Sequence, residues 1–454
     1  MALQTKVDGL PSQTSYEGSH GAQQGGMVRL TTGQEITLSR LLSWAQKGGL
    51  AIVDQGLFSG ANFIVNVLLA RWLEPAQYGA FILAYSMFLF LGAVHTAVLT
   101  EPMAVFGAGK YAEKFREYLG ILIYGHWGVT GIIALVLALL ALAFWGLHSA
   151  AMARVLVGLA LASPFILFLW LVRRAFYVTL RPEWSAVGGV LYVLLMIAGL
   201  YGLYRQQWLS STSALLVMGG SSLVVSMGFL GLLQPSWSSG IGNPSVGMVL
   251  SDHWRYGRWA VSSEALLALH NNIYIVIVTA LLGFASIAAL KAVQNLVTPV
   301  GQFINALTLL FVPNSARHFS QNGASALMTD AVSISVALSL AAFTYWLMAV
   351  IAGPTVVNML YTGKYDEYAG LIYYVAFVPV LTALRVGPNV IQKAAQRSDL
   401  VLITHLCTTC FSFLTAWFFI IFMGVFGAAI GMNIATFLGV VIAWFLLCQQ
   451  KKAK

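Results

Sequence analysis

The sequence predicts an all-α polytopic membrane protein with about 12 transmembrane helices, arranged as two six-helix lobes. Three observations predict this fold class: an apolar composition, a series of long apolar segments, and a weak internal repeat. Of the 454 residues, 59% are hydrophobic and only 9% are charged, whereas soluble domains contain about 25% charged residues. The mean hydropathy is +0.80. The spacing of apolar segments, rather than burial in a soluble core, therefore sets the predicted architecture.

The apolar segments form two groups on either side of a longer polar loop. Residues 1–40 contain no apolar run and are rich in Gly, Gln, Ser and Thr, so we expect a disordered cytoplasmic tail. The remaining predicted parts are an N-lobe (41–233), a linker (234–257), a C-lobe (258–449) and a basic tail (450–454). The N-lobe segments lie near residues 49–69, 79–103, 119–145, 153–176, 184–204 and 213–233. The C-lobe segments lie near residues 258–282, 285–312, 329–351, 368–392, 400–423 and 426–448.

The formal net charge is +9, which in a soluble protein would suggest binding to nucleic acid. Here the basic residues lie in short loops between apolar segments, a pattern that indicates membrane topology and contact with membrane lipids, so no nucleic-acid partner is expected. Most lysines and arginines fall on one side if both termini are cytoplasmic, and the positive-inside rule favours that orientation. The predicted outer loops are too short for an extracellular catalytic domain.

The two halves of the sequence resemble each other weakly. Gln55 aligns with Glu264, Asn62 with Asn271, Leu73 with Leu282 and Gly79 with Ala288. An even number of spans in each half gives both halves the same orientation in the membrane. The halves would then be related by a pseudo-two-fold axis along the membrane normal, as in transporters with parallel repeats, with a substrate site between them near the midplane.

The segment 288–311 has one polar face. On a helical wheel its polar residues fall within an arc of about 100°; they are Lys291, Gln294, Asn295, Thr298, Gln302 and Asn305. Unpaired polar side chains are costly in a bilayer, so this face is expected to line a cavity. The alternative is a row of hydrogen bonds that joins neighbouring helices. Lys291 has an alternative of its own, because a lysine near a helix end can extend to the headgroups.

Other polar residues in apolar segments are further candidates. Arg385, one turn before Asn389, is expected to face the same cavity, or else to be a positive charge near the inner loops. Asn62 and its repeat mate Asn271 lie on polar faces of their segments. Asp54 and Glu264 are the carboxylates we expect to bind a coupling proton or sodium ion, since burial raises a carboxyl pKa. The alternative for each is a salt bridge.

Two short stretches carry a resemblance to a known family. The sequence ARWLEPAQYG at Ala70–Gly79 resembles the turn after the first helix of Wzx-type polysaccharide flippases, with Glu74 in place of the usual Gly. LGFASIA at Leu282–Ala288 resembles the same turn in the second half. These flippases belong to the multidrug/oligosaccharidyl-lipid/polysaccharide (MOP) exporter superfamily, with the MATE exporters and the lipid II flippases. The motif is structural, so it transfers no ligand-binding residues.

The resemblance implies alternating access and movement of a polyprenyl-diphosphate-linked oligosaccharide from the inner to the outer leaflet of a bacterial inner membrane. A diphosphate requires cationic groups, and sugars require amides and hydroxyls. The residues expected to bind this substrate are Lys291, Asn295, Gln302, Asn305, Arg385, Asn62 and Asn271. We expect no cofactor beyond a coupling H⁺ or Na⁺. A glycan polymerase or other export machinery is an expected partner.

Three other functional classes are alternatives to a flippase. A MATE-like exporter of small cationic molecules would need a net acidic cavity, which Lys291 and Arg385 oppose and Asp54 and Glu264 favour. A membrane enzyme would need a nucleophile–base pair, a metal cluster or a phosphate-binding Gly loop, and none stands out. Cys407 and Cys410 lie in an apolar helix and are interpreted as packing residues. A non-transporting scaffold would not require aligned polar faces.

Overall fold

The computed structural model describes the backbone of residues 27–28, 36–37, 56, 60, 62–237, 244–322, 324–395 and 397–452. By internal contacts the chain divides into two units, Met1–Gly49 and Leu50–Lys454. In the first unit, β1 (Met27–Val28) pairs antiparallel with β2 (Ile36–Thr37). The rest of the predicted N-terminal tail lies outside the described residues. In the second unit, the described secondary structure is helical.

The first half of the second unit is a series of long helices. After a helix over residues 62–72, one polypeptide run contains α2 (Pro75–His95), the π-helix η1 (Thr96–Thr100) and α3 (Glu101–Ala108). The 3₁₀ turn η2 (Ala112–Lys114) leads into α4 (Phe115–Gly146). The half closes with α5 (Ala150–Val178), α6 (Pro182–Arg205) and α7 (Ser211–Leu233).

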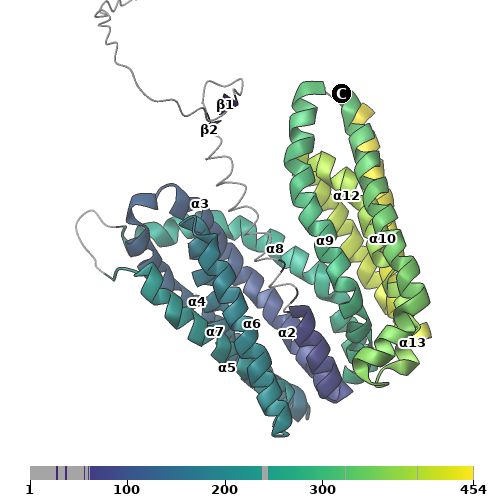
Figure 1. Ribbon diagram of the computed structural model, residues 1–454, viewed down its shortest axis with the longest axis horizontal. Helices are drawn as coiled ribbons and strands as arrows, with labels where there is room; N and C mark the ends of the chain where they lie inside the picture. The colour runs from purple at the N-terminus through teal and green to yellow at the C-terminus, as the bar shows by residue number, and fades with distance from the viewer. Residues whose placement is uncertain are drawn as a thin grey trace, which may run out of the picture. The chain divides into compact units, whose positions relative to one another are not determined.

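The second half begins with α8 (Val246–Leu282) and α9 (Phe284–Asn322). It continues through α10 (Ala324–Tyr361), the 3₁₀ turn η3 (Asp366–Tyr368), α11 (Leu371–Val375) and α12 (Val378–Ala394) to α13 (Ser398–Lys452). In Figure 1 these helices run from teal through green to yellow. Helix α8 begins within the linker predicted at 234–257, so the second half starts about three turns earlier than the apolar pattern indicates.

Local sequence explains several helix ends. Pro75 and Pro182 occupy first-turn positions, where a missing N–H costs nothing. Ser210 and Ser213 form a reciprocal capping box at the start of α7. Gly283 separates α8 from α9 with a φ of +83°, a conformation that a residue with a Cβ adopts only with strain. This last turn is the one that LGFASIA predicts.

The chain is a multi-pass membrane protein. Among the described residues, eight helices are long and apolar enough to cross a membrane, and a ninth is obtained if the two parts of α8, bent by 49° between His270 and Asn272, count as one span. One of the eight, Asp399–Gln450, contains 52 residues and is interrupted at Gly424, which has non-helical torsions. It matches the two segments predicted at 400–423 and 426–448. The predicted segment at 49–69 is described continuously only from residue 62.

Helix α9, which covers the predicted segment at 285–312, is not among these eight or nine spans. It contains the polar face that starts at Lys291. Within the second unit, α5 packs against α4 and α7, while α12 packs against α10 and α13. Helix α2 packs against both α8 and α9 and so links the two groups.

The two turns with the family-like motif meet each other. A Cβ on Gly79 would overlap the backbone carbonyl of Phe284, so only glycine permits this approach of α2 to the start of α9. The side chain of Lys364 donates hydrogen bonds to the carbonyls of Arg71 and Leu73, at 2.7 and 2.8 Å. We call this region the Gly79 end; the ends of α3 and α4 near Lys110 form the Lys110 end.

Candidate functional site

A cavity of about 920 Å³ lies among α2, η1, α5, α8, α9, α11, α12 and α13. The contribution from α2, η1 and α5 is small and largely apolar; it consists of Leu89, Ala93, Thr96 and Trp170. All of its charged lining residues, Lys291, Arg385 and Glu264, come from the second half, as do His270 and His405. The cavity therefore has a polar wall with two basic side chains and one carboxyl group, and an apolar wall with one indole.

Helix α9 presents most of its predicted polar face to the cavity. Lys291, Gln294, Thr298 and Asn305 line it, and their spacing places them on one side of the helix. The hydroxyl of Thr298 donates to the carbonyl of Gln294 at 3.1 Å, which satisfies it within the helix. The structure therefore brings the Lys291 ammonium and the amides of Gln294 and Asn305 to one wall.

Two residues of the same predicted face lie elsewhere. Asn295 is 3% exposed, and its amide donates to the Tyr78 hydroxyl at 3.0 Å. Gln302 is exposed and is not part of the cavity lining. For Asn295 the structure thus shows a hydrogen bond between helices α9 and α2. The ligand-binding roles of both residues stay predictions.

Arg385 and two histidines form a basic cluster in the cavity wall. The rings of His270 and His405 lie 5.6 Å apart, centroid to centroid, at 75°. The Thr409 hydroxyl donates to the carbonyl of His405 at 2.8 Å, so the 2.9 Å contact between His270 Nδ1 and Thr409 Oγ1 is donated by His270. This fixes the hydrogen of neutral His270 on Nδ1.

Several polar atoms in this cluster are buried without a hydrogen-bond partner among the described residues. They include Nη1 of Arg385, Oδ1 of Asn389 and Nδ1 of His405. A buried donor that lacks an acceptor is costly, and a guanidinium recognises oxyanions well because its N–H groups form a planar fork. The arrangement can therefore accept an anionic group against Arg385.

Sequence reasoning had not singled out His405. The signal was present in its spacing, since His405, Thr409 and Ser412 recur on one face of α13. Two of these residues, His405 and Ser412, line the cavity. Cys407 and Cys410, in the same stretch of α13, are free thiols. Among the described residues, no group of three His, Cys, Asp or Glu side chains is placed to hold a metal ion.

The predicted coupling and amide residues are distributed as follows. Glu264 lines the cavity. Asp54 and the side chain of Asn271 lie outside the described residues. Asn62 accepts a hydrogen bond from Asn66 through its backbone carbonyl, and its side chain is not part of the cavity lining. The structure therefore brings Glu264, but not Asn62, to the wall that carries Lys291 and Arg385.

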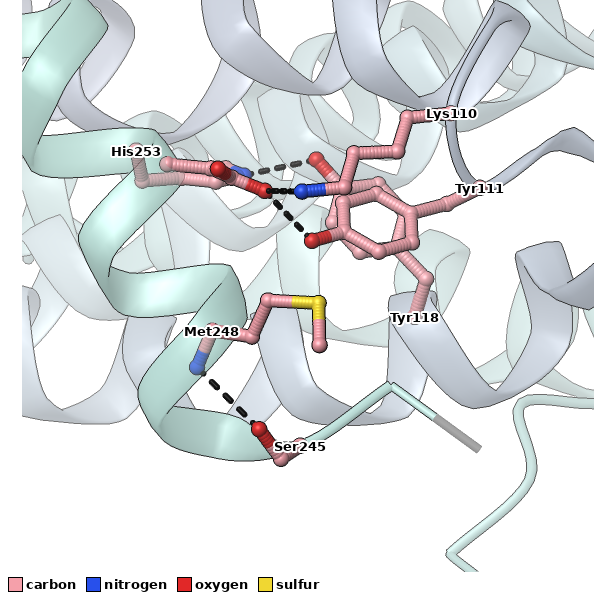
Figure 2. Close-up of polar contacts among 7 residues, drawn as sticks. Lys110, Tyr111, Tyr118, Ser245, Met248 and His253 are labelled. Carbon is pink, nitrogen blue, oxygen red and sulfur yellow. Dashed lines mark hydrogen bonds and ion pairs between the residues drawn. The ribbon is translucent and has the colours of Figure 1, made fainter. Parts of the chain in front are cut away.

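A second polar cluster fixes the start of α8 at the Lys110 end. Lys110 and Tyr111 both donate hydrogen bonds to the carboxylate of Asp252, and Figure 2 shows the side chains of Lys110 and Tyr111 next to each other. The neighbouring His253 donates from Nδ1 to the carbonyl of Val98 at 2.8 Å. Its Nε2 therefore accepts from the hydroxyl of Tyr118 at 2.6 Å. These contacts join α8 to the middle of η1, to the turn after α3 and to the start of α4.

The electrostatics of this cluster favour an ionised Asp252 and a neutral His253. Partial burial opposes ionisation of Asp252, but hydrogen bonds from Lys110 and Tyr111 outweigh it and lower the pKa of the carboxyl. Burial lowers the pKa of His253, despite the opposing effect of the Val98 carbonyl. Acidification should therefore loosen the attachment of α8 through His253 first.

We expect the free energy of unfolding to fall as pH drops below about 6.5, partly through His253. Its folded-state pKa is below the unfolded value, so the unfolded chain binds more protons in that window and stability is lost on acidification. The measurement is the midpoint of thermal unfolding at pH values of about 7.5 and 5.5. His253→Gln should show a smaller loss than wild type. The His148→Gln variant, changed in the loop between α4 and α5, should keep the wild-type loss, and equal losses in all three proteins would contradict the assignment.

No family model matches this sequence, and no curated protein matches it. Solved structures do share its fold. A multidrug resistance MATE family transporter of the MOP superfamily, in an inward-facing conformation, aligns with 89% of this chain and 98% of its own, at 15% identity and a TM-score of 0.73. The lipid II flippase MurJ aligns over 89% of this chain and 87% of its own, at 13% identity and a TM-score of 0.66.

A third structure is a MOP superfamily transporter from Pyrococcus furiosus, described as having a binding pocket of reversed polarity that suggests a different function. It aligns over 90% of this chain and 96% of its own, at 12% identity and a TM-score of 0.64. At such identities the likeness concerns the fold alone. The chain is thus an all-α polytopic membrane protein with the fold of the MATE transporters and MurJ.

Proposed function

We propose that this protein is a flippase that moves a polyprenyl-diphosphate-linked oligosaccharide across the membrane by alternating access. The single observation that carries the proposal is the basic wall of the cavity, where Lys291 and Arg385 lie with His270 and His405. A cavity with an excess of one charge raises the local concentration of the opposite charge. The bare Nη1 of Arg385 suits an oxyanion.

The other wall suits the rest of such a substrate. Trp170 lines the cavity. Its ring is edge-on to that of Phe88, with the ring centroids 5.8 Å apart, and a Cβ added to Gly92 would lie 3.3 Å from it. Aromatic rings offer apolar faces for sugar rings, and the amides of Gln294 and Asn305 opposite offer donors and acceptors for hydroxyls. We infer a glycan between these walls, with the diphosphate on the Arg385 side.

The proposal includes orientation and setting. The Lys110 end carries the basic loop GKYAEKFREY (Gly109–Tyr118), so it is placed on the cytoplasmic side by the positive-inside rule. The membrane is a bacterial inner membrane, the protein is not an enzyme, and a glycan polymerase or export machinery receives the product. Membrane lipids surround the apolar faces.

The experiment that tests the function is a leaflet assay in a deletion strain. Polyprenyl-diphosphate glycan is extracted after labelling of cells and of inverted vesicles with a membrane-impermeant periodate and hydrazide reagent. The flippase proposal expects intermediate to accumulate in the cytoplasmic leaflet, together with loss of a surface polysaccharide that a plasmid copy restores. Normal distribution of the intermediate and normal surface glycan would overturn it.

A MATE-like exporter of small cationic molecules is the second candidate. Glu264 in the cavity lining favours it, since a carboxylate can bind either a cation or a coupling proton. The measurement that separates the two is the sensitivity of the same deletion strain to cationic dyes. Increased dye sensitivity with normal glycan would favour the exporter.

A further inference from the structure

Two histidines outside the cavity form a fully buried pair in the first half. His95 ends α2, and His126 lies in α4. Both have 0% exposure. Nε2 of His95 lies 3.0 Å from Nδ1 of His126, and the rings are perpendicular, with centroids 5.2 Å apart. The geometry is that of one imidazole N–H donating to the other imidazole nitrogen.

The outer nitrogens of the pair have no partner. Nδ1 of His95 and Nε2 of His126 are buried without a hydrogen bond to any described residue. Because the inner contact uses one hydrogen, a neutral pair leaves one outer N–H and one outer lone pair unsatisfied. That lone pair can bind a proton. Without such a role, burying two histidines whose outer nitrogens have no hydrogen-bond partner only costs free energy.

The surroundings of the pair contain no opposite charge among the described residues. From α4 the pair faces Trp127, and from α5 it faces Phe168. The backbone carbonyl of Pro164, also on α5, faces His126 outside hydrogen-bonding geometry. Among the contacts described, each histidine has the other as its titratable neighbour, across the 3.0 Å contact. A proton bound here without rearrangement would therefore place an uncompensated charge in an apolar interior.

The backbone next to the pair has an unusual winding. The π-helix η1 begins at Thr96, directly after His95, and ends at Thr100. Single π-helical turns are rare and frequently occur at functional sites, where a local change of winding rotates the neighbouring side chains. Thr96 lines the cavity. Because Thr96 directly follows His95 in the chain, a change of winding at η1 would connect the buried pair to the cavity.

We propose that His95 and His126 form a proton-binding site that couples transport to proton movement. The inference rests on the proposed transport function for its purpose, although not for its geometry. A ligand shifts a conformational equilibrium only if it binds the two states differently. The pair satisfies this condition because its buried arrangement suits the neutral form, whereas the protonated form requires an arrangement that reaches cavity water past Thr96.

The first test needs no substrate. The full-length protein in lipid nanodiscs is examined by hydrogen–deuterium exchange of the segment that contains η1, at pH values of about 7.5 and 5.5, with correction for the intrinsic pH dependence of exchange. In wild type we expect these amides to exchange about tenfold faster at the lower pH. A tenfold change corresponds to a difference of about one unit between the pKa of the pair in the closed and in the open arrangement of η1. His95→Gln/His126→Gln retains side-chain hydrogen bonding and should lose this response, while His148→Gln should keep it.

Two results would overturn the proposal: an equal pH response of η1 in the double variant and in wild type, or no response in wild type. A second readout tests coupling in proteoliposomes with a fluorescent polyprenyl-diphosphate disaccharide. The double variant should retain exchange at equal pH on both sides but lose stimulation by a pH gradient, and retained stimulation would also overturn the proposal. If wild type moves no probe while η1 keeps its histidine-dependent response, the proposed flippase function fails and the proton site stands.

Discussion

Replacing Gly79 with alanine is expected to cause a larger loss of stability than the same change at Gly92, the other glycine of α2. The new Cβ would overlap the carbonyl of Phe284, which is backbone and cannot rotate away. Relieving the overlap requires α2 and the start of α9 to separate. Overpacking of this kind costs about 1–3 kcal/mol and sometimes more, and here it acts where the two halves of the protein meet.

The matched control is Gly128→Ala on α4, where an added Cβ meets no atom within 4 Å. In a helix, glycine is less favourable than alanine by about 0.5–1 kcal/mol, so this variant should unfold at the same or a higher temperature than wild type. Thermal unfolding of purified protein, followed by size-exclusion chromatography, measures both variants. The two variants are expected to change the unfolding temperature in opposite directions. A Gly79→Ala protein with the unfolding temperature of wild type would show that the close approach is not maintained in the membrane.

A milder change tests the same junction without a steric clash. Lys364→Met removes the two hydrogen bonds to the carbonyls of Arg71 and Leu73 while retaining an unbranched chain. Buried hydrogen bonds from a charged donor contribute about 1.5–3 kcal/mol each, and the partial exposure of Lys364 reduces this contribution. This variant should therefore unfold at a lower temperature than wild type.

The structure explains why one part of the polar face of α9 was predictable and another was not. A period of 3.6 residues places Lys291, Gln294, Thr298 and Asn305 on one side of a helix, and the cavity lies on that side. Periodicity does not predict which neighbouring helix packs against each turn of α9. Asn295 lies at the edge of the arc, where α2 crosses and the Tyr78 hydroxyl meets it.

Contacts between distant segments account for the remaining differences. The pairs His95–His126 and His270–His405 each join two helices that are distant in the sequence, so the spacing of residues along the chain gives no reason to associate them. The start of α8 was predicted as linker because its polar residues hide its helical character from a hydropathy scan. Asp252 and His253 are accommodated there by Lys110 and Tyr118, which are far away in sequence. By contrast, the break at Gly424 was predictable, because apolar segments flank a short glycine-containing gap.

Removing the two cavity cations is expected to have the largest effect on transport. Hydrogen bonds to charged groups contribute about 1.5–3 kcal/mol each, so loss of one should weaken binding of a diphosphate roughly tenfold to a hundredfold. Lys291→Met and Arg385→Gln should each reduce the rate at which proteoliposomes move a fluorescent polyprenyl-diphosphate disaccharide, and the double variant should be inactive. Lys393→Ala, exposed at the end of α12, is the control that should keep the wild-type rate.

The same variants separate the two candidate functions because the expected signs are opposite. A diphosphate is attracted by Lys291 and Arg385, so neutralising them weakens its binding. A cationic drug is repelled by them, so neutralisation leaves Glu264 as the remaining charged lining residue and should strengthen binding of a dye such as ethidium. Fluorescence titration of purified wild type and double variant with each ligand measures both effects. Tighter ethidium binding with unchanged diphosphate binding would contradict the flippase proposal, because the basic wall would then serve only to exclude cations.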